Sequence, residues 1–201
     1  MKKILTAITL SLMLVGCQGD NDDPKEPTKN NKPFTFMKEG NEWVYDYNDG
    51  HYLYSETIVS KNNDSFCVVR NIICPDNFQE KTYYWYIKDN YWCENYYPQP
   101  SLFGLDYIII PQNCYIGQKW RNPIHESAAY CYEIVSLSET ETETVPAGTF
   151  DNCIKLKCTI EQNGVTSNFL GYSYYRKDIG RISCNDQNGL IVKLHSYNLK
   201  K

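Results

Sequence analysis

The chain has 201 residues, and its 24 Asp and Glu against 20 Lys and Arg give a formal net charge of −4. An acidic chain without a run of basic residues lacks the patch that phosphate binding needs, so nucleic acid is not an expected partner. This length suits one domain with a sizeable hydrophobic core.

The first seventeen residues have the layout of an export signal. Met1-Lys2-Lys3 is basic, and the apolar run over residues 4–16 is too short to span a bilayer. Leu14-Val15-Gly16 then precedes Cys17. This order resembles the bacterial lipoprotein signal, which implies that residues 1–16 are removed and that Cys17 is lipidated. The alternative is an ordinary signal peptide with an incidental cysteine.

Residues 17–33 are expected to be a tether, because they contain three prolines and no aliphatic residue that could enter a core. Asp20, Asp22 and Asp23 resemble the acidic export signal of surface lipoproteins in Bacteroidota. A plain solvated linker is the alternative interpretation of these aspartates. The implied location is the outer membrane, with a lipid anchor and the domain on its cell-surface or periplasmic face.

Residues 34–201 are rich in Tyr, Ile, Val, Thr and Trp, and no stretch has a sustained helical period. We expect a mostly β domain: a single antiparallel, strongly curved sheet or half-barrel, with little helix. Asp89-Asn90 is a plausible two-residue turn. It would set Ile87 opposite Trp92 and Tyr86 opposite Cys93.

Asn163-Gly164 is the strongest hairpin signal, because a type I′ turn requires positive φ at both central residues. Before it, apolar residues alternate with polar ones from Ile154 to Ile160, which predicts a half-buried strand. The alternation puts Cys158 with the core and Cys153 on the outward face. Residues 182–194 are predicted to form a further hairpin.

Eight cysteines follow Cys17, and an even number in an exported chain predicts a disulfide framework. Free thiols and a metal site are the alternatives, but no C-x-x-C occurs and no His lies at ligand spacing. We therefore expect no metal and no cofactor. An extended segment from Cys153 to Cys158 would separate them by roughly 16 Å, too far for a bridge. The disulfide candidates are Cys67, Cys74, Cys93, Cys114, Cys131, Cys153, Cys158 and Cys184.

Aromatic residues crowd the segment 83–97. Aromatic strands can present a platform for a sugar or an apolar ligand. Packing within the sheet is the alternative explanation for the crowding. The candidate ligand-facing aromatics are Tyr84, Tyr86, Tyr91 and Trp92.

Four motifs carry a resemblance to a known group of proteins: Gly40-Asn41-Glu42-Trp43, Gly117-Gln118-Lys119-Trp120, Val145-Pro146-Ala147-Gly148-Thr149-Phe150 and the segment 174–182. Their order resembles Bacteroidota-type envelope lipoproteins of unknown function, related to lipoprotein-carrier-like β half-barrels. The resemblance implies a fold and no activity. Pro146-Ala147-Gly148 should form a tight turn, with Phe150 pointing back into the sheet. Gly180 suits a bulge or a crowded turn.

Motifs for nucleophilic, phosphate-binding or metal chemistry are absent from the sequence. His51, His125 and His195 lie far apart, and Glu139, Glu141 and Glu143 share one face of a predicted strand, which is typical of a solvated surface. Whether the protein is an enzyme stays open, with a non-enzyme favoured.

The sequence therefore predicts a lipid-anchored envelope protein with a non-enzymatic binding or structural accessory role. Two alternatives stay open: a glycan-binding or glycan-processing surface lipoprotein, and a carrier of apolar ligands on the concave face of the sheet. An apolar cavity would favour the carrier, and a flat aromatic strip would favour the glycan binder. Two carboxylates converging in a cleft would favour an enzyme.

Overall fold

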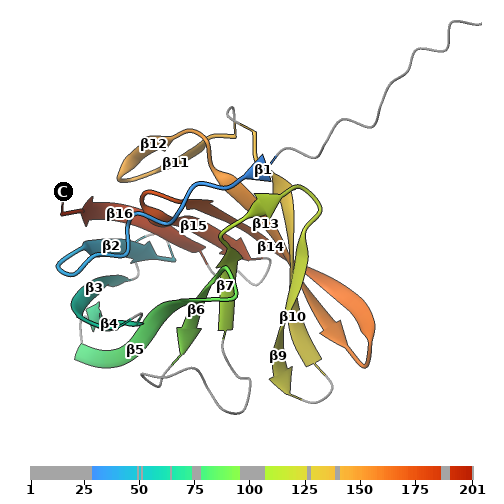
Figure 1. The fold of residues 1–201 in the computed structure, drawn as a ribbon, viewed down its shortest axis with the longest axis horizontal. Coiled ribbons are helices and arrows are strands. Elements are labelled where there is room, and N and C mark those ends of the chain that lie inside the picture. The colour runs from blue at the N-terminus through green and yellow to red at the C-terminus, as the bar shows by residue number, and fades with distance from the viewer. Residues whose placement is uncertain are drawn as a thin grey trace, which may run out of the picture.

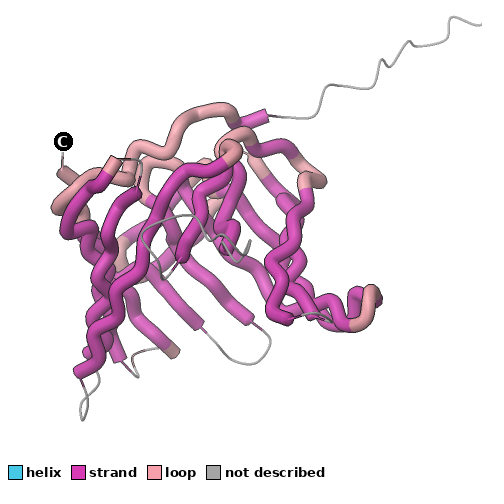
Figure 2. Tube along the Cα trace, turned by 60° about the horizontal axis from the view of Figure 1, so that its bottom comes forward, coloured by secondary structure: helices cyan, strands magenta, loops and turns pink. Residues whose placement is uncertain are grey.

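Strands alone build the part of the chain that the structure describes. This computed structural model describes residues 29–200, apart from 49, 51, 64, 74–77, 96–106, 126–127, 139–140 and 187–190. Across these described ranges the chain forms no helix (Figure 2), and therefore none that is long and apolar enough to cross a membrane. The predicted mostly β fold is confirmed.

Twelve strands form one antiparallel sheet that curls nearly into a barrel (Figure 1). Its spatial order is β7-β6-β5-β4-β3-β2-β16-β15-β14-β13-β10-β9. The first half of the chain supplies β2 (Glu42–Tyr47), β3 (Tyr52–Asn62), β4 (Ser65–Ile73), β5 (Phe78–Lys88), β6 (Tyr91–Asn95) and β7 (Tyr107–Pro111). The second half supplies β9 (Lys119–His125), β10 (Ala128–Ser136), β13 (Ile154–Gln162), β14 (Val165–Arg176), β15 (Gly180–Asp186) and β16 (Ile191–Asn198).

Two small antiparallel pairs complete the fold. β1 (Lys29–Asn30) pairs with β8 (Cys114–Tyr115), and β11 (Glu143–Val145) pairs with β12 (Gly148–Phe150). In the large sheet, β16 pairs with β2, which joins the two ends of the described chain. This pairing leaves β7 and β9 as the two edge strands of the sheet, where they meet at a seam.

The predicted hairpins form with the predicted partners. Ile87 lies opposite Trp92 and Tyr86 opposite Cys93, and both turn residues, Asp89-Asn90, have positive φ. Asn163-Gly164 likewise has φ values of 52° and 76° between β13 and β14. Asn tolerates this left-handed region and Gly favours it, which is why these dipeptides fix the register. β15 and β16 also pair as expected.

Aromatic side chains fill one end of the curled sheet. The ring of Phe36, which precedes the first strand of the large sheet, lies 4.9 Å from Trp92, 5.8 Å from Trp43 and 6.0 Å from Trp85. All three contacts are edge-to-face, the arrangement that aromatic quadrupoles prefer. Gly180, beside this ring, has φ 104°, a backbone conformation that L side chains rarely adopt, whereas an added Cβ would lie at an ordinary 3.5 Å from the ring. Gly180 directly follows the turn between β14 and β15, and its positive φ rather than crowding favours glycine there.

The segment before β2, residues 29–41, runs across the sheet (Figure 1), and its Phe36 belongs to this aromatic cluster. Lys177, only 6% exposed, holds it in place. Its ammonium donates hydrogen bonds to the carbonyls of Asn30 at 2.7 Å and Lys32 at 2.9 Å, and also to that of Gln112. The described contacts of the domain therefore begin upstream of Phe34.

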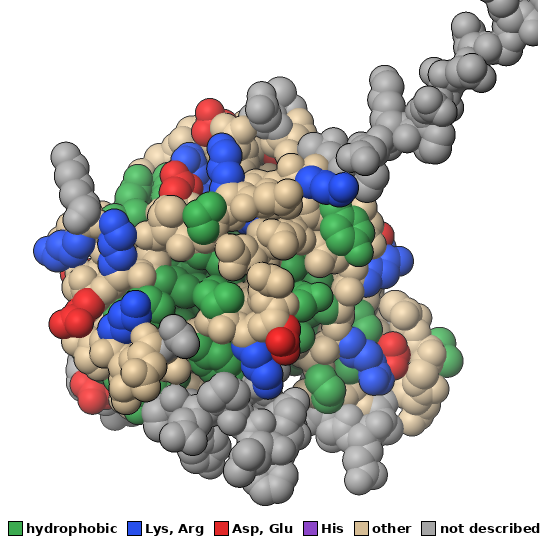
Figure 3. All heavy atoms as spheres, in the orientation of Figure 1, with side chains coloured by type: hydrophobic (Ala, Val, Ile, Leu, Met, Phe, Trp, Pro, Cys, Tyr) green, Lys and Arg blue, Asp and Glu red, His purple; other side chains and the backbone are tan. Residues whose placement is uncertain are grey.

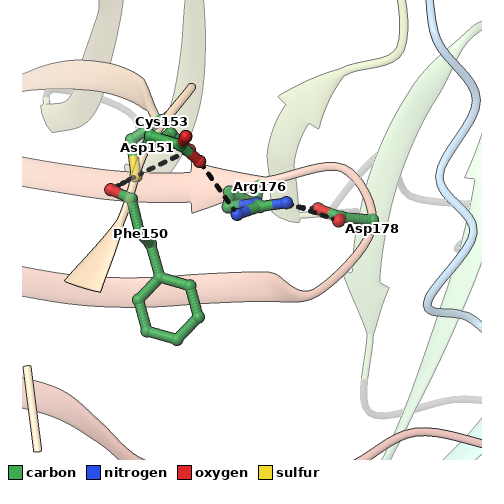
Figure 4. Close-up of polar contacts among 5 residues, drawn as sticks. All are labelled: Phe150, Asp151, Cys153, Arg176 and Asp178. Atoms are coloured by element: carbon green, nitrogen blue, oxygen red, sulfur yellow. Dashed lines mark hydrogen bonds and ion pairs between the residues drawn. The ribbon is translucent and has the colours of Figure 1, made fainter. Parts of the chain in front are cut away.

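The β11–β12 hairpin packs against the outside of β15 and β16. Its turn contains Gly148 at φ 133°, and Phe150 is buried, as the sequence predicted. Cys153 is also fully buried, which corrects its predicted outward placement. It lies just before β13, and its thiol donates to the Phe150 carbonyl at 3.3 Å (Figure 4). Cys153 is buried because the β11–β12 hairpin covers the chain at this position, just before β13.

Candidate functional site: a cavity on the concave side of the sheet

A cavity of about 280 Å³ lies on the concave side of the sheet. The wall is supplied by the edge strand β7 and by β10, β13, β14, β15 and β16. At one end lies the buried Tyr175, and at the other lie Leu170, half-buried, and Asn185, exposed. The lining residues are Tyr107, Ile109, Tyr130, Tyr132, Cys158, Leu170, Gly171, Ser173, Tyr175, Arg181, Cys184, Asn185 and Val192. Most of this wall is aromatic or aliphatic.

Tyrosines from both sides of the seam form one wall of the cavity. The hydroxyls of Tyr107 and Tyr132 contact each other, and the Trp120 ring stacks on Tyr132 at 5.4 Å between centroids. Burial raises the pKa of both tyrosines, so each stays a neutral hydroxyl near pH 7. The wall therefore combines apolar rings with uncharged hydrogen-bonding groups.

The seam beside this wall is closed by side chains. The Asn122 amide donates to the Ile108 carbonyl at 2.7 Å and accepts from the Ile108 N–H at 3.0 Å. The Trp120 indole N–H also donates to that carbonyl at 3.1 Å. Asn122 is buried, and backbone polar groups in a buried place need hydrogen-bond partners. Its amide therefore pairs with groups of β7 that a neighbouring strand would otherwise bond.

Charged side chains occupy the interior of the sheet next to the cavity. Glu56 is 2% exposed and accepts hydrogen bonds from the Arg70 guanidinium at 2.6 and 2.9 Å. The same guanidinium lies 4.6 Å from the Tyr83 ring centroid. Glu94 accepts from the Trp85 indole at 3.2 Å, and burial raises its pKa. These residues form a polar network inside the barrel.

Arg181 is the charged residue that lines the cavity itself. It lies on β15 opposite Tyr175 of β14, and its electrostatic neighbours include Tyr54, Tyr45 and Glu56. Within the part of the chain that the structure describes, no carboxylate forms an ion pair with it, in contrast to Arg70. The cavity therefore joins an apolar wall to one cationic group.

No disulfide joins the seven cysteines that the structure describes, so it does not bear out the predicted framework; Cys74 lies outside the described residues. Cys131 pairs with Thr159 and Cys158 with Tyr132, so Cys131 and Cys158 face opposite sides of neighbouring strands. Cys67 and Cys93 share a face but have all of β5 between them. Two strand spacings exceed the reach of a disulfide. Cys158 and Cys184 line the cavity instead.

The candidate ligand-facing aromatics do not form a common platform. Trp92 is 2% exposed and lies in the aromatic cluster. Tyr86 is also 2% exposed, but it lies on the opposite face of the β5–β6 hairpin. Tyr84 and Tyr91 are half-buried. Tyr91 sits beside the turn of its hairpin, and Tyr84 pairs with Asn95 further along the ladder. None of these four residues lines the cavity.

Cys17 and the tether up to residue 28 lie outside the described residues, as do His51 and Glu139. Glu141 forms an ion pair with Lys155 at 3.1 Å, and Glu143 accepts from the Ser183 hydroxyl at 2.7 Å. Over the described ranges, no three His, Cys, Asp or Glu side chains gather as a metal site would require. These carboxylates have structural partners.

The sequence interpretation missed Arg181 and Tyr175 as site residues, because the segment 174–182 was assigned to the fold alone. It also missed Glu56 and Arg70. A signal for these two was present, since Glu56 falls between Tyr54 and Ile58 on the inward face of β3. A charge at the centre of an apolar alternation indicates a buried polar site.

No family model matches this chain, and no curated protein matches it. Among solved structures, it is similar to a Bacteroides fragilis protein that is predicted to be exported and has a YmcC-like fold. The two share 15% identity, with a TM-score of 0.47, over 82% of this chain and 98% of the other.

On the face shown in Figure 3, hydrophobic side chains gather near the centre and charged ones lie mostly toward the rim.

Proposed function

We propose that this chain is a non-enzymatic binding protein of the cell envelope, which holds a small, largely apolar ligand on the concave side of its curled sheet. The observation that carries the proposal is the cavity of about 280 Å³ with its aromatic and aliphatic wall. Small-molecule sites are concave and mostly apolar, with a few placed polar groups. Ligand sites usually measure about 300–1,000 Å³, so the volume here favours a small ligand.

This proposal adopts the carrier alternative over the glycan alternative. Glycan binding through a flat strip would need exposed rings, whereas Trp92 and Tyr86 are buried. An enzyme would be favoured by two carboxylates converging on the cavity. Glu56 and Glu94 do not line it, and each is engaged by Arg70 or Trp85. The binding role therefore draws most support from the geometry.

Anchoring at the outer membrane is part of the same proposal and depends on Cys17. The support is the sequence alone: a basic start, a short apolar run and Leu-Val-Gly before the cysteine. We expect Cys17→Ala to move the protein from the membrane fraction to the soluble fraction. A variant that keeps its membrane partition and precursor processing would overturn the anchor and leave the cavity proposal intact.

Binding of the neutral dye phenylnaphthylamine tests the cavity directly, because its fluorescence rises in apolar surroundings. We expect saturable binding to the wild-type protein. Leu170→Trp places a large ring at the open end of the cavity and should abolish binding. Val165→Trp is the matched control on the same strand, since Val165 is 65% exposed and outside the cavity. Equal dye binding by both variants would refute the proposal.

A further inference from the structure

The cavity wall indicates the chemical class of the ligand, an inference that rests on the proposed function. Arg181 lines the cavity and lies on β15 opposite Tyr175 of β14. A guanidinium is permanently charged and presents a planar fork of N–H donors. Such a fork matches a carboxylate in two-point geometry, with short, charge-assisted hydrogen bonds.

The charges around Arg181 leave it as a site for an anion. Glu56 and Glu94 both interact electrostatically with Arg181, but both hydrogen bonds at Glu56 Oε1 come from Arg70. Glu94 receives its bond from Trp85. The hydroxyls of Tyr175 and Tyr54 are neutral, because burial raises the pKa of both, and each interacts electrostatically with Arg181. A guanidinium removed from bulk water without a directly paired carboxylate is costly to bury, and the cavity gives an anion access to Arg181.

Away from Arg181, the cavity offers surface for an apolar body. Ile109, Val192, Leu170 and the ring of Tyr130 line it toward the open end. A ligand that fills the cavity therefore needs two unlike ends. We infer that the ligand is an amphipathic organic anion, a carboxylate on a short apolar chain, whose head group binds Arg181 and whose chain lies along this wall.

Calorimetric titration with octanoate and with octanol separates the head group from the chain, because the two probes share their length and differ in charge. The wild-type protein should bind octanoate about tenfold or more tightly than octanol at pH 7, the advantage expected of a charge-assisted hydrogen-bonded pair. Arg181→Gln should remove this preference, because it weakens octanoate binding by a larger factor than octanol binding. Arg181→Lys should keep a reduced preference, since Lys carries the charge without the planar fork.

Arg121→Gln is the matched control, because Arg121 lies outside the cavity and pairs with Glu161 at 2.5 Å on the surface. It should keep the full preference for octanoate. The comparison of the two probes on wild-type protein needs no variant, so misfolding of Arg181→Gln does not remove the test. Octanol binding as tight as octanoate would overturn the anion inference and keep the cavity proposal. Failure of both probes and of the dye would overturn the cavity proposal itself.

Discussion

Asn122 holds both backbone polar groups of Ile108, donating to its carbonyl at 2.7 Å and accepting from its N–H at 3.0 Å. The two residues lie on β9 and β7, the edge strands of the twelve-stranded sheet. An unpaired edge invites association with other strands, and proteins cover or close such edges. Here one side-chain amide takes the place of a strand-to-strand pair and closes the curled sheet beside the tyrosine wall of the cavity.

Replacing Asn122 with Ala should destabilise the protein by about 1–3 kcal/mol, because the N–H and C=O of Ile108 lose their partner in a buried place. Urea unfolding followed by tryptophan fluorescence measures the change. Gln162→Ala, at an exposed position at the end of β13, should stay within about 0.5 kcal/mol of the wild type. Equal stability of the Asn122 and Gln162 variants would show that the amide does not close the seam.

Glu56→Gln keeps the shape of the side chain and removes its charge, which leaves the Arg70 guanidinium without a counter-ion. Loss of one partner of a buried pair costs about 3–5 kcal/mol. We expect the lower end, because the Arg70 side chain is 22% exposed. Glu133→Gln breaks the exposed Lys119–Glu133 pair and should cost at most about 1 kcal/mol. The same urea titration measures the loss of unfolding free energy in both variants. A loss in the Glu56 variant no larger than in the Glu133 variant would contradict a buried network.

Phe36 ties the N-terminal segment to the tryptophan cluster. Phe36→Ala should cost about 3–5 kcal/mol, as expected for removal of a buried aromatic ring. Phe34→Ala should cost less, because Phe34 is only half-buried. Thermal unfolding compares the two variants. If the order were reversed, Phe34 would be the residue that fastens this segment to the sheet.

Stability should fall at alkaline pH. Burial raises the pKa of Tyr45 well above its ordinary value, and the nearby Glu56 raises it further. A group whose pKa is higher in the folded state stabilises the fold fully below its unfolded pKa of about 10 and loses that contribution as the pH rises above it.

The alkaline unfolding midpoint, read by tyrosinate absorbance and circular dichroism, should therefore rise in Tyr45→Phe. Tyr197→Phe is the control, since Tyr197 is 41% exposed and should leave the midpoint where it is. An unchanged midpoint in Tyr45→Phe would mean that this tyrosine ionises without unfolding the sheet.

Peptide mapping without reductant should recover no disulfide-linked peptides among Cys67, Cys93, Cys114, Cys131, Cys153, Cys158 and Cys184. None of the seven is bridged in the structure, and the ladder keeps Cys67 from Cys93 and Cys131 from Cys158. Alkylation of the denatured protein supplies the count. A linked pair from this set would show that the oxidised protein has a different strand register.

Local signals predicted most of the fold. The dipeptides Asp89-Asn90 and Asn163-Gly164 fixed two registers, because their backbone needs no distant partner to favour positive φ. The tight turn at Gly148 follows from the same chemistry. These features depend on a few neighbouring residues, so single-sequence reasoning reaches them.

The closure and the cavity depend on long-range contacts and were out of reach. Nothing near Asn122 signals that its amide meets Ile108 on a distant edge strand. Cys153 became buried only because the β11–β12 hairpin folds over it. Arg181 resembles any strand arginine until β14 and β15 curl toward β7. Sequence periodicity reports which face a residue takes, and it does not report what covers that face.

Residue-resolved NMR titration with octanoate shows where on the sheet a ligand binds. We expect saturable amide shifts at residues along the cavity, centred on Gly171, Arg181, Cys184 and Val192, with the outer-face residue Lys157 unmoved. Leu170→Trp should abolish these shifts. Shifts confined to the convex surface, or no saturable shifts at all, would contradict a ligand site on the concave side of the sheet.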